Sequence, residues 1–184
     1  MSVTAIIVSR MDANLGEVLW AIQKHCDEII IVKGEGGVME RWEAARRAKY
    51  PVIYTQDDDA IVDVGGVLAA YDRAAITCNM PADRRGEYQD GIALVGWGCT
   101  YSRDAALPLR ALLRYTEKWP CDWRARREAD RIVTGLSEVR LIDIPFTHLP
   151  IAHHKCRMGR QIEHGDSLRE IRRRIYAVRG VETK

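Results

Sequence analysis

The chain has 184 residues, of which 47% are hydrophobic and 29% charged, and its formal net charge is +2. This length fits one domain with a buried core, and the composition excludes a disordered chain. A charge so close to zero gives no indication of a nucleic-acid or membrane-surface protein, and no apolar run is long enough to span a membrane.

Five cysteines are scattered along the chain, and no two of them form a C-x-x-C pair. An odd and unpatterned set suits a reducing compartment, so we expect small buried thiols in a soluble, cytoplasmic protein. Met1 leads at once into an apolar strand pattern, without the basic segment and apolar stretch of a secretory signal.

Apolar strands alternate with amphipathic helices in the first half of the chain, which predicts a parallel α/β sheet. The expected elements are buried strands at 3–8, 28–32 and 52–55, and helices at 15–22, 39–49 and about 64–71. The second half has shorter elements: a surface loop at 81–89, strands at 92–95, 99–102 and 139–144, helices near 109–113 and from about 124 to 136, and a basic helix near 167–178.

Three consecutive carboxylates, Asp57, Asp58 and Asp59, follow the third predicted strand. They repel one another unless a cation or hydrogen-bond donors offset their charge. Ligands of open α/β sheets bind at the carboxyl ends of strands, and hard oxygen ligands there suit Mn²⁺ or Mg²⁺ bridging to a diphosphate. The alternative is a solvated acidic turn that caps the next helix.

The segment Val52 to Asp59, V-I-Y-T-Q-D-D-D, resembles the strand that carries the DxD motif of GT-A glycosyltransferases, the nucleotide-diphospho-sugar transferase fold. Two further segments follow that family's order, T-A-I-I-V-S-R at the start of the chain and L-V-G-W-G-C-T-Y-S-R-D-A from Leu94 to Ala105. The resemblance covers about residues 3 to 136. It implies a GT-A-like three-layer α/β sandwich with a mostly parallel central sheet, with residues 1–144 as the catalytic domain and 145–184 as a tail and basic helix completing the same domain.

The resemblance also implies roles for particular residues. Asp59 and Asp57 would bind the metal, while Asp57 and Asp58 would contact the donor. The other donor-binding candidates are Ser9, Arg10, Lys33, Glu35, Trp97 and Gly98. A role as simple loop residues stays open for the first four, and a place in the core stays open for Trp97.

The segment R-E-A-D-R-I-V-T-G-L, from Arg127 to Leu136, resembles the late helix that supplies the catalytic base in these enzymes. Asp130 takes the matching position. On a helix, Glu128 and Asp130 flank opposite sides of the apolar stripe, so we choose Asp130 as the base and Glu128 as the second candidate. The alternative is a surface carboxylate that pairs with neighbouring arginines.

Four histidines fall in the last forty residues, and many GT-A enzymes complete the metal's ligands with a histidine from this region. His164 is the first candidate and His154 the second, although an exposed loop histidine is the alternative for each. The arginines of the closing helix form either a solvated face, a clamp on the donor diphosphate, or a contact with an anionic acceptor.

Together these features predict a metal-dependent glycosyltransferase that moves a sugar from a nucleotide-diphosphate donor to a hydroxyl acceptor. Since the chain is short, we expect either a macromolecular acceptor (protein, polysaccharide or DNA) or a homodimer that completes the site. The alternatives are a nucleic-acid-binding module and a sugar-phosphate nucleotidyltransferase, which is disfavoured because Ser9-Arg10-Met11-Asp12 replaces its glycine-rich signature. A phosphatase of the haloacid dehalogenase type is disfavoured because its aspartates follow the first strand.

Overall fold

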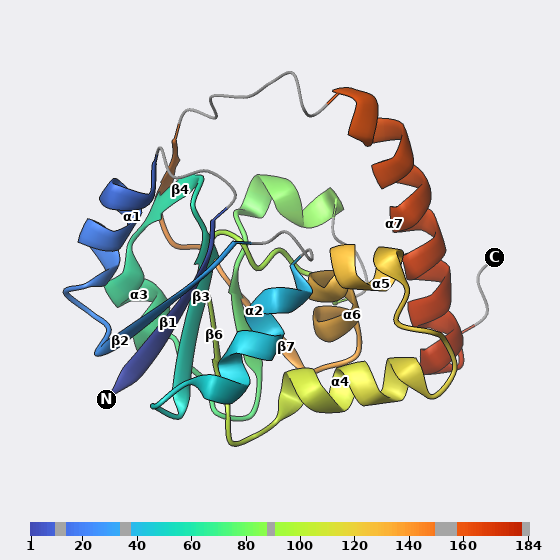
Figure 1. Cartoon of the computed structure of the whole chain (residues 1–184), viewed down its shortest axis with the longest axis horizontal. Helices are drawn as coiled ribbons and strands as arrows, with labels where there is room; N and C mark the ends of the chain where they lie inside the picture. Colours follow the sequence, from blue (N-terminus) through green and yellow to red (C-terminus); the bar gives the residue numbers. More distant parts are fainter. Residues whose placement is uncertain (10–13, 34–37, 88–90, 150–157, 182–184) are drawn as a thin grey trace.

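A six-stranded sheet forms the middle layer of the protein in the computed structural model (Figure 1). The structure describes residues 1–9, 14–33, 38–87, 91–149 and 158–181. The strand order is β2-β1-β3-β6-β5-β7, built from β1 (Val3–Val8), β2 (Glu28–Val32), β3 (Val52–Asp57), β5 (Ile76–Asn79), β6 (Cys99–Ser102) and β7 (Val139–Ile142).

Only β6 runs against its neighbours in this sheet. β1 pairs in parallel with β2 and β3, and β5 pairs in parallel with β7, whereas β6 lies antiparallel between β3 and β5. The carboxyl ends of the five parallel strands and the beginning of β6 therefore meet at one edge of the sheet. The predicted three-layer sandwich with a mostly parallel sheet is confirmed.

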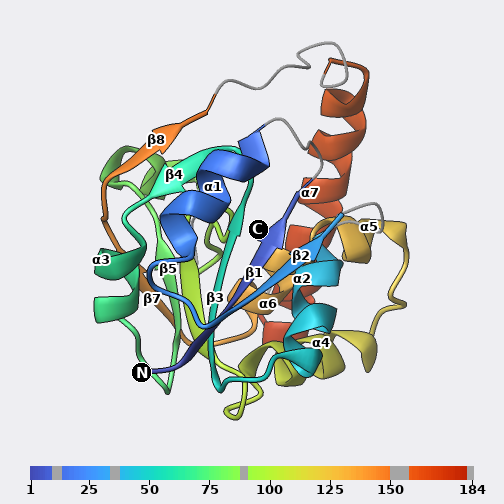
Figure 2. The same cartoon turned by 60° about the vertical axis from the view of Figure 1, so that its left-hand side comes forward.

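Helices cover both faces of the sheet. One face carries α1 (Leu15–Ile22), α3 (Val64–Ala69) and a separate antiparallel pair, β4 (Ala60–Val62) with β8 (Phe146–His148), which Figure 2 shows side by side near α1. The other face carries the remaining helices: α2 (Met39–Ala44), α4 (Leu107–Thr116), α5 (Trp123–Arg127), α6 (Ala129–Gly135) and α7 (Met158–Arg179). Two 3₁₀ segments, η2 (Ala45–Arg47) and η3 (Ala82–Glu87), complete the described elements.

The apolar pattern of the sequence explains most of this arrangement. All six residues of β1 are buried, as expected for a continuous apolar strand covered on both faces. Val18 and Ile22 form the inner face of α1. The side chains of Asp63 and Asp122 accept hydrogen bonds from backbone N–H groups and so begin α3 and α5.

Several predicted elements differ from the structure. The predicted strand at 92–95 is wrong, because the Ala93 N–H donates to the Thr134 hydroxyl (3.0 Å) instead of to a neighbouring strand. The helix expected from about residue 124 is broken at Glu128, whose backbone leaves helical geometry between α5 and α6. The strands β4, β5 and β8 were not predicted, and the loop at 81–89 contains η3.

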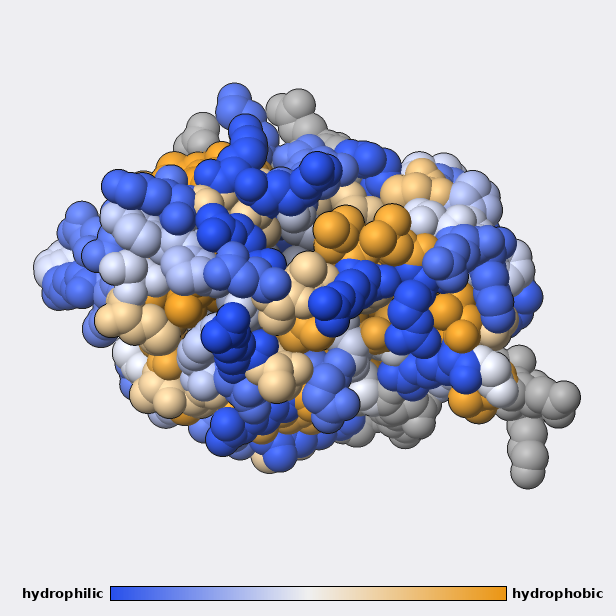
Figure 3. Space-filling view, turned by 90° about the horizontal axis from the view of Figure 1, so that it is seen from below, coloured by the Kyte–Doolittle hydropathy of each residue, from blue (hydrophilic) through white to orange (hydrophobic). Residues whose placement is uncertain are grey.

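The closing helix α7 packs against α4, α5 and α6. Arg174 anchors it, since its guanidinium donates to the Tyr115 hydroxyl (3.0 Å) and contacts the carboxylates of Asp122 and Glu170. On the underside, α4 exposes Leu109 and Leu113, and Figure 3 shows apolar patches interspersed with hydrophilic residues there. Among the described residues, no helix is long and apolar enough to cross a membrane.

Gly98, at the beginning of β6, has a positive φ of 98°. A Cβ at this position would lie 3.1 Å from Val62 Cγ1. We expect Gly98→Ala to lower the free energy of unfolding by about 1–3 kcal/mol, because both the backbone conformation and the contact oppose a side chain. Urea denaturation measures the change.

Gly16 provides the matched control, since it lies in α1 and a Cβ added there would meet nothing within 4 Å. Gly16→Ala should leave stability unchanged or raise it by about 0.5 kcal/mol. Equal effects of the two substitutions would contradict the strain assigned to Gly98.

Candidate functional site

The acidic triplet lies at the edge of the sheet where the parallel strands end. Asp57 is the last residue of β3, and Asp58 and Asp59 form the turn into β4. Asp58 is buried, and its carboxylate accepts a hydrogen bond from the Ser9 hydroxyl at 2.7 Å. Ser9 and Asp58, both predicted to contact the donor, thus connect the ends of β1 and β3.

Arg41 of α2 is the central charge of this site, and its side chain is fully buried. Its Nη2 contacts Asp57 Oδ1 at 2.5 Å, its Nε lies 3.3 Å from Asp130 Oδ1, and its Nη1 donates to Thr55 Oγ1 at 3.3 Å. Asp57 and Asp130 came from separate motifs, and the structure brings them to the same guanidinium.

Arg41 was not predicted from the sequence as a residue of the site. It lies in a short polar helix near the exposed Arg46 and Arg47, and no local pattern distinguishes the buried arginine from these two. Its role becomes visible only when α2 is packed against β3 and α6.

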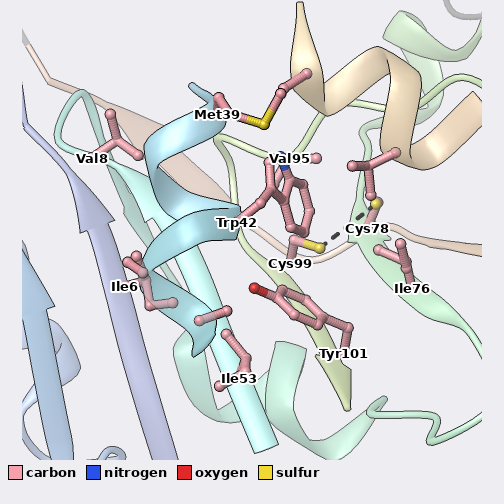
Figure 4. Packing of buried hydrophobic residues seen from close by; sticks show 14 of the residues in the cluster. Ile6, Val8, Met39, Trp42, Ile53, Ile76, Cys78, Val95, Cys99 and Tyr101 are labelled. Atoms are coloured by element: carbon pink, nitrogen blue, oxygen red, sulfur yellow. Dashed lines mark hydrogen bonds between the residues drawn. The ribbon is translucent and has the colours of Figure 1, made fainter. Parts of the chain in front are cut away.

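Trp42, the next residue of α2, also holds Asp130. Its indole Nε1 donates to Asp130 Oδ1 at 2.9 Å, and its ring contacts Tyr101 of β6 with the centroids 5.1 Å apart. Figure 4 shows the two rings close together beside α2. A buried Arg-Trp pair on one helix therefore fixes the position of the candidate base.

The environment of Asp130 shifts its acidity. The side chain is only 17% exposed, and burial raises its pKa from 3.8 to about 6. Arg41 and the Trp42 hydrogen bond oppose this increase, while the charges of Asp57 and Glu128 add to it. A carboxyl group with this pKa can accept a proton near neutral pH.

Glu128, the second candidate, has a different environment. Its buried carboxylate lies 3.2 Å from Arg131 Nε and 3.8 Å from Arg127 Nε. Of the two candidates, Asp130 is therefore the one that shares the Arg41 guanidinium with Asp57.

The loop of Gly96, Trp97 and Gly98 lies against the acidic triplet. The Asp57 N–H donates to the Gly96 carbonyl at 2.9 Å, and a Cβ on Gly96 would come within 2.4 Å of Asp57 Oδ2. Only glycine allows the Asp57 carboxylate to lie this close to the loop. Trp97 is half-buried, and its ring stacks on Phe146.

Carboxylate oxygens such as those of the acidic triplet are ligands that a hard divalent cation prefers. The described residues contain no group of three or more His, Cys, Asp or Glu side chains that could hold a metal. Mg²⁺ in nucleotide enzymes is nevertheless held by one or two carboxylates, with substrate phosphates and waters as its other ligands. Asp57 and Asp59, at the carboxyl edge of the sheet, stay the predicted pair for such a smaller set.

The remaining site predictions fall on residues with fewer described contacts. Lys33 follows β2 and is exposed at the same edge of the sheet. Arg10, Glu35 and His154 lie outside the described residues. His164 lies in α7, but its side chain is outside the described part of the structure.

The arginines of α7 pair mainly with neighbouring acids. Arg169 pairs with Asp166, and Arg173 and Arg174 pair with Glu170. Arg179 donates to the Gly135 carbonyl at 2.7 Å. These contacts favour the interpretation of α7 as a packed and locally neutralised helix over a clamp on a diphosphate.

No known protein family matches this sequence, and no curated protein matches it significantly. Among solved structures, the chain is similar to HddC from Yersinia pseudotuberculosis, with 9% identity, a TM-score of 0.47, and coverage of 82% of this chain and 95% of that one.

Two other solved structures are also similar. The inositol-1-phosphate CTP transferase from T. maritima has 14% identity and a TM-score of 0.42, covering 92% of this chain and 78% of that one. A protein from Bacillus anthracis named as a glucose-1-phosphate thymidylyltransferase, in complex with a sucrose, has 12% identity and a TM-score of 0.38, covering 98% and 77%. At such low identities and TM-scores the likenesses say nothing of function, which must be argued from the residues of the site.

Replacing Arg41 with methionine would leave Asp57 and Asp130 close together without their shared cation. We expect Arg41→Met to lower the free energy of unfolding by about 3–5 kcal/mol, the usual effect of removing one partner of a buried ion pair. Urea denaturation near neutral pH measures this change.

The exposed Arg46, a few residues further along, is the matched control, and Arg46→Met should change stability by less than about 0.5 kcal/mol. Adding Asp130→Asn to Arg41→Met should recover part of the loss, because one uncompensated carboxylate is removed. An Arg41→Met protein as stable as the wild type would contradict the buried ion pair.

The pKa of Asp130 predicts a pH dependence of stability. Between pH 3.8 and about 6, the folded protein retains a proton that the unfolded chain has released. This contribution to stability is complete below the lower value and is lost as the pH rises through the higher one. Relative to Asp130→Asn, the wild type should lose about 2 kcal/mol between about pH 4 and about pH 7.

Denaturation of both proteins across this pH range measures the difference between them, so that other titrating groups cancel. A difference that stays constant with pH would contradict the raised pKa.

Proposed function

We propose that this protein is a metal-dependent glycosyltransferase that moves a sugar from a nucleotide-diphosphate donor to a hydroxyl group. The observation that carries the proposal is the buried ion-pair cluster in which Arg41 joins Asp57, in the acidic triplet, to Asp130. It supports the proposal because Asp57, one of the two carboxylates proposed to bind the cation, shares Arg41 with an acid whose pKa of about 6 suits a general base.

Each residue would have a defined task in this reaction. Ser9 would hold Asp58, while Asp57 and Asp59 would hold Mn²⁺ or Mg²⁺. The ion, when bound, neutralises the charge on the departing diphosphate. Lys33, at the end of β2, lies on the side proposed for the nucleotide.

Asp130 would take the proton of the acceptor hydroxyl. The hydroxyl oxygen then bonds to the anomeric carbon of the donor sugar, and the bond from that carbon to the diphosphate oxygen breaks. Arg41 and Trp42 support this step because they hold the carboxylate in place and favour its ionised form. The acceptor in this proposal is a macromolecule: a protein, a polysaccharide or DNA. The alternative is that a second copy of the chain completes the site.

Nucleotidyl transfer is the second candidate. It is the activity in the names of two similar structures, and it would use the same acidic edge to bind a nucleoside triphosphate and a sugar phosphate. The two reactions release different products. Glycosyl transfer releases a nucleoside diphosphate, whereas nucleotidyl transfer releases pyrophosphate.

A thermal-shift screen of nucleotide sugars, with and without Mn²⁺, tests the site. A uridine or guanosine diphosphate-sugar at about 100 times its Kd should raise the Tm by roughly 5–10 °C only when the metal is present. The Asp59→Asn variant should lose this response because a metal ligand is removed. Assays for nucleoside diphosphate and for pyrophosphate then identify the reaction.

Asp104→Asn is the matched control, since Asp104 follows β6 at the opposite end of the sheet and pairs only with the half-buried Arg103 in the contacts described. It should keep the full metal-dependent shift. Donor binding that needs no metal, or that survives Asp59→Asn, would overturn the proposed site, and pyrophosphate release would replace glycosyl with nucleotidyl transfer.

A further inference from the structure

The strand β2 forms one side of the sheet and leaves its backbone open to a further strand. It stands at the end of the strand order and, among the described residues, pairs only with β1. Its sequence, E-I-I-I-V, is apolar after Glu28, and Ile31 is 45% exposed. Figure 2 shows β2 as the outer strand next to β1.

Edge strands of soluble proteins usually carry a charge, a proline or a bulge that prevents pairing with another chain. The strand at the other end of the sheet, β7, follows this rule, since the exposed Arg140 lies within it. Residues 29–32 of β2 contain neither a charge nor a proline, and the register with β1 is unbroken. This strand is therefore suited to pairing with another one.

The backbone of β2 determines which residues can form the new hydrogen bonds. The Val32 carbonyl accepts from the Ser9 N–H at 2.8 Å, so the backbone groups of Val32 face β1. Because these groups alternate between the two edges of a strand, the N–H and C=O groups of Ile29 and Ile31 face away from β1. Ile29 of one chain and Ile31 of a second chain can then exchange hydrogen bonds, and two-fold symmetry repeats this pair.

The charges at the two ends of β2 favour a second copy of this chain as the partner. The exposed Asp27 precedes the strand and the exposed Lys33 follows it. In an antiparallel pair centred on Ile30, Asp27 of each copy lies opposite Lys33 of the other. Between these charges, Ile29 lies opposite Ile31. Opposite charges and apolar side chains that face each other across two strands both stabilise the pair.

We propose that the protein forms a symmetric homodimer in which β2 pairs with β2 of a second copy in antiparallel orientation, joining the two sheets into one. The inference does not depend on the reaction proposed above. Because the two strands run in opposite directions, the carboxyl edges of the two sheets face opposite ways. Each copy therefore keeps its own acidic triplet, and Lys33 lies at the border between the dimer contact and the nucleotide side of the site.

The size of the contact sets the expected strength of the dimer. Pairing of one short strand buries less than the roughly 800 Å² per partner of a standard interface, so the association should be weak. We expect a Kd of about 10 µM, and sedimentation velocity between about 1 and about 200 µM should show the monomer converting to a dimer.

Ile31→Glu tests the edge of β2 directly. The new carboxylate would lie opposite an apolar side chain and diagonally across from Asp27 of the second copy. We expect it to weaken the Kd of the dimer at least about tenfold. Since the Ile31 side chain is exposed, the variant should fold, which circular dichroism and thermal unfolding check.

Leu113→Glu is the matched control, because Leu113 is 55% exposed and lies on α4, which packs against α6 and α7. It should dimerise like the wild type. A dimer that is broken by Leu113→Glu and not by Ile31→Glu would assign the contact to α4 and overturn the proposal.

Cross-linking tests the register of the two strands. Ile30 lies opposite its own copy in a pair without hydrogen bonds, where the Cα atoms are about 4.5 Å apart, and a disulfide spans about 4.4–6.8 Å. Ile30→Cys should therefore form a disulfide-linked dimer under mild oxidation. Ile31→Cys should not, because its two copies are already offset by about 7 Å along the strands. The wild type, with its half-buried Cys26 and exposed Cys121, gives the background.

Three results would overturn the proposal besides a contact on α4. They are a wild type that stays monomeric up to about 200 µM, an Ile31→Glu variant that dimerises like the wild type, and cross-linking through residue 31 as efficient as through residue 30. The last result would show that the strands pair in another register than the one in which Asp27 faces Lys33.

Discussion

A buried guanidinium needs counter-charges, and in this protein two carboxylates supply them. Arg41 contacts Asp57 at the end of β3 and Asp130 at the beginning of α6, so one side chain of α2 joins three elements at the carboxyl edge of the sheet. Because one cation serves two acids in a poorly solvated place, the charge balance stays negative. The raised pKa of Asp130 follows first from its burial, and the charges of Asp57 and Glu128 add to it.

The rest of the site is arranged around this cluster. Ser9 fixes Asp58 from the side of β1, and the absence of a side chain at Gly96 lets the Asp57 carboxylate lie close to the loop. Beyond that loop, Asn79 holds the backbone that carries Trp97 and the segment leading to β8. The edge thus presents an acidic centre beside the loop that carries Trp97.

Local sequence patterns predicted β1 and β3 most clearly, because these strands are buried on both faces. V-T-A-I-I-V and V-I-Y-T are continuous apolar runs, and burial on both faces needs no knowledge of partners. The acidic triplet was equally visible, because charge repulsion between consecutive residues is local. Strands with weak patterns were missed or misplaced. β5 is short, β8 has three residues, and the buried 92–95 segment bonds to Thr134 instead of to a strand.

By itself the sequence determined the α/β class and the acidic end of β3, and it predicted Asp130 ahead of Glu128 as the candidate base. Only the tertiary structure decided that Arg41 lies between Asp57 and Asp130, that Asn79 braces the Trp97 loop, and that Phe146 and His148 join Trp97. These contacts connect residues between 16 and 89 positions apart, as the numbering of Arg41, Asp57 and Asp130 shows for the ion pairs. Periodicity and propensity act over a few residues along the chain, whereas ion pairs, amide hydrogen bonds and ring contacts form only after packing brings distant segments together.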